Sequence, residues 1–181
     1  MFKQIATISI LTLVMTGCVS PEKDTGFAAQ TAIAKSSSLV EETPDMMEIV
    51  RLDANTQKVD RMIKGLKKHV GKTWYVFSGS SPSGWDCSGL TLWAYGQIGV
   101  PLEHRASKQE SAGTKVKDPK PGDLVIFKYS NSKTAYHVGI YIGDGLMIHA
   151  PRKGEVTRIE SVAKFGGNYS KISYTRLIDT V

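Results

Sequence analysis

The sequence contains little of what builds disulfide-rich, zinc-binding or membrane-spanning proteins. Its 181 residues include two cysteines, Cys18 and Cys87, so a network of disulfides cannot hold the fold together. No CxxC or HExxH spacing is present, which argues against a zinc site, and we expect no cofactor. The apolar stretch from Ile5 to Met15 is too short to cross a bilayer as a helix. Internal repeats and phosphate-cradling glycine motifs are also missing.

Residues 1–17 have the form of an export signal. An apolar stretch over residues 5–15 leads to Met15-Thr16-Gly17-Cys18, with small residues before the cysteine. This junction resembles the lipobox of bacterial lipoproteins, which implies cleavage before Cys18 and its diacylation, so that lipid anchors the protein to a membrane. We expect residues 18–43, rich in Ser, Thr, Ala, Glu and Lys, to form a flexible tether. Val19 resembles the pattern for outer-membrane sorting, which in a diderm host would place the protein on that membrane, facing the periplasm.

Residues 44–181 are expected to form one domain in which helices precede strands. Thr43 and Pro44 predict a helix start, with Thr as the cap and Pro at the first helical position. Helices followed by a meander of strands predict an α+β fold with an antiparallel sheet of about five strands. The expected helices cover residues 44–52, 56–70, 87–99 and 105–112, and the expected strands cover residues 124–128, 137–142, 146–150, 156–159 and 172–178.

Cys87 stands where a loop rich in Gly, Ser and Pro gives way to an apolar helical pattern. This change predicts a helix that begins near Cys87. The free N–H groups and the positive end of the dipole at a helix start favour a thiolate, as a nucleophile requires. If Cys18 carries lipid, Cys87 is the one remaining thiol of an exported chain. A buried structural cysteine is the alternative interpretation.

The hairpin around Gly143-Asp144-Gly145 decides where two histidines point. A three-residue loop ending in a left-handed Gly145 pairs Ile142 with Leu146 and Gly139 with His149, and it makes one face of the hairpin entirely apolar. His137 and His149 then share the opposite face as diagonal neighbours, close enough for their rings to meet. A lone histidine on a strand is usually structural, but two converging histidines and one thiol favour chemistry.

Cys87, His137 and His149 together allow thiol acyl transfer. Cys87 would attack a carbonyl carbon as a thiolate, while His137 accepts the proton and later protonates the leaving amine. His149 fits the place of a third polar group that orients His137. The backbone N–H of Cys87 and the hydroxyl of Tyr75 are candidate donors to the oxyanion. Zinc is the rival use of one Cys and two His, and it would need a fourth ligand or open water.

Four motifs in order resemble the NlpC-type cell-wall cysteine peptidases, over about residues 60–178. The resemblance implies a papain-like minimal fold and hydrolysis of peptide bonds in peptidoglycan stem peptides. It also implies Cys87 as nucleophile, His137 as base and His149 as the polar third member. Tyr75, at the family's upstream tyrosine position, would help to bind the oxyanion or substrate. The motifs are Asp86-Cys87-Ser88-Gly89-Leu90, Lys120-Pro121-Gly122-Asp123-Leu124, His137-Val138-Gly139-Ile140-Tyr141-Ile142-Gly143 and Ile148-His149-Ala150-Pro151.

Asp86 and Ser88 match positions that touch substrate, particularly its ammonium group, in some members of that family. Because an anion beside a thiolate raises the thiol pKa, Asp86 fits better as a substrate contact or a helix cap. The sequence departs from the family at Glu103, His104 and Arg105, where many relatives carry Pro, Arg and Ser. This departure lies near the substrate groove and concerns specificity rather than the type of reaction.

We expect a murein endopeptidase that cuts next to diaminopimelate. The γ-D-glutamyl–diaminopimelate bond is the first choice and the D-alanyl–diaminopimelate crosslink the second. An N-acetylmuramoyl-L-alanine amidase, another thiol acyltransferase, and a non-catalytic wall-binding or phage-tail module are the alternatives. A silent module would have lost the cysteine or a histidine. The formal net charge of +6 favours encounter with the carboxylates of peptidoglycan, and we expect a monomer that binds no nucleic acid.

Overall fold

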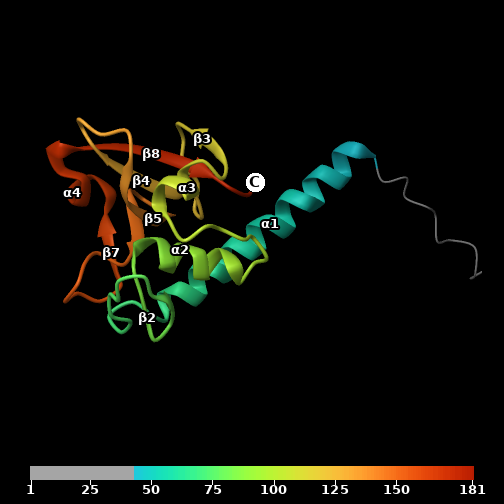
Figure 1. The fold of residues 1–181 in the computed structure, drawn as a ribbon. Helices are drawn as coiled ribbons and strands as arrows, with labels where there is room; N and C mark the ends of the chain where they lie inside the picture. The colour runs from blue at the N-terminus through green and yellow to red at the C-terminus, as the bar shows by residue number, and fades with distance from the viewer. Residues whose placement is uncertain (1–42) are drawn as a thin grey trace, which may run out of the picture. The chain divides into compact units, whose positions relative to one another are not determined.

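The computed structural model describes residues 43–181 (Figure 1). The predicted signal peptide 1–17, the predicted lipidation of Cys18 and nearly all of the predicted tether 18–43 lie outside the described residues. Helices and an antiparallel sheet confirm the α+β class. Within residues 43–181, no helix combines the length and the apolar character that crossing a membrane would need.

The first helix, α1, runs unbroken over Pro44–Lys67, so the predicted interruption before Thr56 is wrong. Thr43 caps it through its hydroxyl, which accepts a hydrogen bond of 3.4 Å from the Met46 N–H. Thr56 does not cap a second helix, because its hydroxyl donates back to the Leu52 carbonyl at 2.9 Å, as it can inside a helix. The second half of α1 buries an apolar stripe that consists of Val59, Met62, Ile63 and Leu66.

Helix α2 covers Cys87–Gly96 and begins at the predicted residue, although it ends earlier than the predicted Gly99. Two short strands, β1 (Ser80–Ser81) and β2 (Gly84–Trp85), pair in the loop that precedes it. Helix α3 follows as a short element, Ala106–Glu110. The loop, α2 and α3 follow α1 in the sequence and precede the strands of the large sheet (Figure 1).

Six strands form one antiparallel sheet in the order β3-β8-β4-β5-β6-β7, where about five were predicted. The additional strand is β3, whose three residues are too few to give a periodic signal. Strand β7 begins at Arg158, whereas the predicted Val156 forms only an isolated bridge to Trp74. The strands are β3 (Thr114–Val116), β4 (Leu124–Tyr129), β5 (Ala135–Gly143), β6 (Leu146–His149), β7 (Arg158–Ser161) and β8 (Ser170–Arg176).

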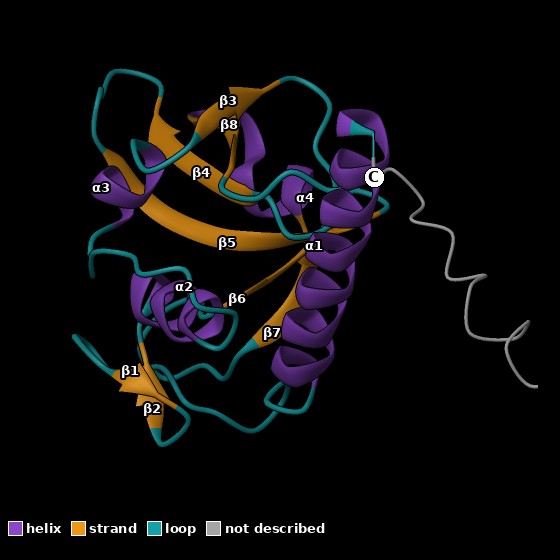
Figure 2. Cartoon of the chain, turned by 90° about the vertical axis from the view of Figure 1, so that its right-hand side faces the viewer, coloured by secondary structure: helices purple, strands orange, loops and turns teal. Residues whose placement is uncertain are grey.

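Both faces of the sheet are covered, and α2 and α4 lie on opposite sides of β5 (Figure 2). On one face, Leu90 of α2 and the buried stripe of α1 pack against Ile140 of β5. On the other face, Phe127 and Met147 pack against α4, Val162–Gly166, a helix that the sequence did not predict. A 3₁₀ turn, Gly167–Tyr169, leads from α4 into β8. His137 on β5 and His149 on β6 are therefore buried.

The β5–β6 hairpin has the predicted register over most of its length. Tyr141 pairs with Met147, and continuing this pairing sets the two histidines on one face. A bulge near the turn places Gly143, instead of the predicted Ile142, opposite the first residue of β6. Gly145 adopts the predicted left-handed conformation, with φ of 70°.

Candidate functional site

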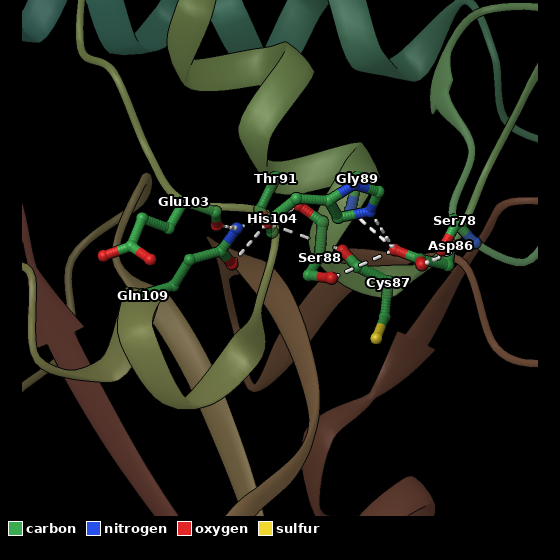
Figure 3. Close-up of polar contacts among 9 residues, drawn as sticks. All are labelled: Ser78, Asp86, Cys87, Ser88, Gly89, Thr91, Glu103, His104 and Gln109. Carbon is green, nitrogen blue, oxygen red and sulfur yellow. Dashed lines mark hydrogen bonds and ion pairs between the residues drawn. The ribbon is translucent and has the colours of Figure 1, made fainter.

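Cys87 is the first residue of α2, and Asp86 is the N-cap of this helix (Figure 3). The Asp86 carboxylate accepts hydrogen bonds from the Gly89 N–H at 2.7 Å and from the buried Ser88 hydroxyl at 3.0 Å. It also accepts the N–H of Ser78 at 3.0 Å, which ties the preceding loop to the helix start. Asp86 therefore acts as a helix cap, one of the two roles that the sequence allows.

The loop before α2 lies tightly against the first turn of the helix. A side chain at Gly89 would collide with the carbonyl of Gly79, which accepts the Asp86 N–H at 3.1 Å. Earlier in this loop, the Tyr75 N–H donates to the Glu155 carbonyl at 2.9 Å. Partial burial, followed by the nearby Cys87 and Asp86, raises the pKa of the Tyr75 phenol. Tyr75 also forms a backbone bridge with Trp85, two residues before Cys87, which places it near the start of α2.

The Cys87 thiol is partly buried, and the backbone N–H groups of Val138, Ser88 and Cys87 donate toward it. These donors lower the thiol pKa, but burial and then the Asp86 carboxylate outweigh them and raise it to about 11. The helix start lowers the thiol pKa in the predicted direction, but in the unliganded protein desolvation and Asp86 outweigh this effect. Since Val138 directly follows His137, the same contact brings the thiol to the strand that carries this histidine.

His137 and His149 meet as the hairpin register predicts. His137 Nε2 and His149 Nδ1 lie 2.8 Å apart, and the two rings are nearly perpendicular, at 87°. A side chain at Gly139 would lie 3.2 Å from the His149 Cβ and closer still to Met147, so glycine leaves the space that these side chains fill. The ring of Phe165 in α4 covers both imidazoles, with centroid distances of 4.6 and 4.7 Å.

A carboxylate that the sequence analysis did not single out completes this chain of hydrogen bonds. Glu160 Oε2 lies 3.2 Å from His149 Nε2 and also accepts from Arg158 Nε at 3.0 Å. The signal was the polar alternation Arg158-Ile159-Glu160, which sets both charged residues on the face that carries His149. The sequence did not point to Glu160, because the predicted strand ended at Ile159.

Glu160, the acceptor at the end of this series of hydrogen bonds, determines which ring nitrogens of His137 and His149 carry a hydrogen. Because a carboxylate paired with Arg158 can only accept, His149 Nε2 carries a hydrogen and its Nδ1 is the acceptor. His137 then donates through Nε2, which leaves its Nδ1 unprotonated. Glu160 and His149 thus prepare His137 to accept a proton at Nδ1.

Both imidazoles are neutral near pH 7. Burial, followed by the neighbouring His149, lowers the pKa of His137 well below its ordinary value. Burial also lowers the pKa of His149 to about 4, although Glu160 acts in the opposite direction. A neutral thiol and a neutral imidazole therefore form the site before a ligand binds.

The described residues offer no rival metal centre. Among residues 43–181, no group of three or more His, Cys, Asp and Glu side chains is arranged to hold a metal ion. His137, His149 and Glu160, which do meet, are joined by the hydrogen bonds described above. The arrangement that remains is a thiol at a helix start beside a strand that carries an oriented imidazole.

This fold and site define a papain-like α+β domain with a Cys and a His–His–Glu chain. The family model described as the NlpC/P60 family matches residues 71–177, and the chain belongs to this family. It is 36% identical to the crystal structure of the NlpC/p60 domain of peptidoglycan hydrolase SagA, with a TM-score of 0.57 over 65% of this chain and 98% of that domain. An NlpC/P60 family protein from Bacillus cereus is 30% identical, with a TM-score of 0.60 over 66% of this chain and 40% of that one.

Curated relatives match about half of the chain. A Mycobacterium bovis protein named as a probable endopeptidase is 40% identical over 102 residues, which are 55% of this chain and 26% of the relative. Protein P54 of Enterococcus faecium is 44% identical over 98 residues, which are 52% of this chain and 18% of the relative. The chain thus spans about a quarter or less of these relatives, and the match concerns one domain.

Proposed function

We propose that the protein is a peptidoglycan hydrolase that cuts peptide bonds in stem peptides with Cys87 as nucleophile. The observation that carries this proposal is the position of Cys87 at the start of α2, where it packs against the apolar cluster that includes Val138, the residue after His137. Membership of the NlpC/P60 family supports the class of reaction, as do relatives described as an endopeptidase and a peptidoglycan hydrolase.

The neutral forms of Cys87 and His137 determine how the reaction begins. The thiol proton passes to His137 Nδ1 as sulfur bonds to the peptide carbonyl carbon, whose oxygen becomes the oxyanion. The carbon–nitrogen bond then breaks, and the imidazolium returns the proton to the leaving amine. In the second half, His137 takes a proton from water, hydroxide adds to the thioester, and sulfur leaves and regains a proton. His149 and Glu160 stabilise the imidazolium in both halves.

The oxyanion needs hydrogen-bond donors that face the tetrahedral carbon. The backbone N–H groups of Cys87 and Ser88 already donate toward the sulfur and lie in the first turn of α2. Tyr75 can supply a hydroxyl from the loop held to this turn. The two backbone N–H groups are fixed by the helix before substrate arrives, which is the condition for electrostatic stabilisation of a transition state.

We infer cleavage next to diaminopimelate, at the γ-D-glutamyl–diaminopimelate bond first and the D-alanyl–diaminopimelate crosslink second. Lipidation of Cys18 would anchor the protein to the envelope, on the outer membrane facing the periplasm in a diderm host. Residues 18–43 would give the domain the reach to meet stems near its anchor. A coil of this length has a root-mean-square span of about 25–30 Å.

Digestion of purified muropeptides, followed by mass spectrometry of the products, tests the proposal. Diaminopimelate-containing stems should yield fragments cut at one of the two named bonds. Amidated or lysine-containing stems should react more slowly, because they change the group beside the scissile bond. Cleavage between the sugar and L-alanine would instead identify an amidase and overturn the choice of bond.

A further inference from the structure

The Asp86 carboxylate has a partner from outside its own loop and helix. Its Oδ1 lies 2.8 Å from Nε2 of His104, in the segment between α2 and α3. Figure 3 shows the His104 ring beside the first turn of α2, with a nitrogen toward Asp86. The other donors to this carboxylate described above are two backbone N–H groups and a hydroxyl. Among them, His104 alone can carry a positive charge.

A buried amide holds His104 in place. Gln109 is fully buried, and its Nε2 donates to the carbonyls of Glu103 at 2.8 Å and Ser88 at 2.9 Å. Its Oε1 accepts the hydroxyl hydrogen of Thr91 at 2.6 Å. One side chain therefore fastens the backbone next to His104 to the first turns of α2 (Figure 3).

The contact matters because the negative charge of Asp86 disfavours the thiolate form of Cys87, the proposed nucleophile. After burial, its negative charge is the largest cause that raises the pKa of Cys87. A donor or cation on the carboxylate withdraws part of that charge from the thiol. The His104 side chain is 28% exposed, against 12% for Asp86, so the partner can be changed without opening the core.

We propose that His104 is a positioning residue that acts through Asp86: it offsets the carboxylate's charge and keeps the Cys87 thiol more reactive than Asp86 alone would allow. The inference deepens the proposed function, since it rests on Cys87 as nucleophile. Thiol reactivity is nevertheless measurable without peptide cleavage. The charged neighbours of His104 in its own segment, Glu103 and Arg105, are exposed.

The test is the rate at which iodoacetamide modifies Cys87 in the full chain between pH 6 and 11, followed by peptide mass spectrometry. A rise of one pKa unit lowers the thiolate fraction about tenfold, and the greater nucleophilicity of a more basic thiolate returns about threefold. His104→Ala should therefore slow alkylation about threefold at neutral pH. His104→Arg should restore the wild-type rate, and His104→Gln should be intermediate. Arg105→Ala, which removes a full charge nearby, should change nothing.

A double-mutant cycle separates this role from a structural one. Asp86→Asn keeps a good helix cap but removes the charge, so adding His104→Ala to it should have no further effect. Wild-type alkylation in His104→Ala and His104→Gln would overturn the inference, as would slowing that persists in the Asp86→Asn background. A wild-type protein that cleaves no stem peptide but shows the expected alkylation pattern would overturn only the proposed function.

Discussion

Replacement of His149 tests the hydrogen-bond chain behind the proposed base. His149 is fully buried, accepts from His137 Nε2 at 2.8 Å and lies 3.2 Å from Glu160. In His149→Asn, the amide oxygen can still accept from His137. In His149→Leu, a side chain of similar bulk offers no acceptor. The two variants therefore separate the acceptor from the space that the ring fills.

The expected losses of kcat depend on which ring nitrogen of His137 carries the hydrogen. Without an acceptor, the buried Nε2–H of His137 costs about 1–3 kcal/mol. The ring can avoid this cost by moving its hydrogen to Nδ1, and it then has no lone pair for the Cys87 proton. His149→Leu should lower kcat by about 10²–10⁴-fold, the usual contribution of a general base. His149→Asn should lose about tenfold.

The assay is the rate of product release from a defined muropeptide, with thermal melting as the control for folding. Leu and Asn variants that are equally and completely inactive while both stay folded would refute a role of His149 as acceptor for His137. That outcome would indicate a metal site. A chelator that inactivates the wild-type protein, with recovery on adding metal back, would establish it.

Three further predictions concern the dependence of stability on pH, the loss of stability when one ion pair is weakened, and the association of the protein with membranes. Because burial lowers the pKa of His149 to about 4, the unfolded chain takes up a proton below about pH 6.5 that the folded chain does not. His149 should therefore contribute about 2 kcal/mol to the fall in the free energy of unfolding in urea from pH 7 to 5, in addition to any contribution from His137, and a fall unchanged in His149→Asn would contradict this. Asp123→Asn, which weakens a two-point pair with Arg176 at 2.7 and 3.0 Å, should cost about 1–3 kcal/mol, whereas the exposed Glu48→Gln should cost nothing measurable. Mature protein should fractionate with membranes and carry a diacylated Cys18; unmodified Cys18 in soluble protein would refute the anchor.

The parts of the site that the sequence could predict depend on local signals. The start of α2 at Cys87 follows from turn residues that give way to helical periodicity. The meeting of His137 and His149 follows from a hairpin whose register is set by one apolar face. In both cases the residues that decide the geometry lie within about one element of each other.

The remaining features depend on contacts between segments. Glu160 reaches His149 from the next strand, and His104 reaches Asp86 from beyond the end of α2. The hydrophobic periodicity of the sequence gives no indication of such pairs between separate segments. The thiol pKa could not be predicted from the helix start alone, since the cost of burying Cys87 depends on how closely β5 packs against it.

The most direct test of the account compares wild-type protein with Cys87→Ala on diaminopimelate-containing muropeptides. Replacing one small side chain by another should leave the melting temperature nearly unchanged. The account predicts that wild type releases fragments cut beside diaminopimelate and that the folded variant releases none. Cleavage by Cys87→Ala at the wild-type rate would contradict it.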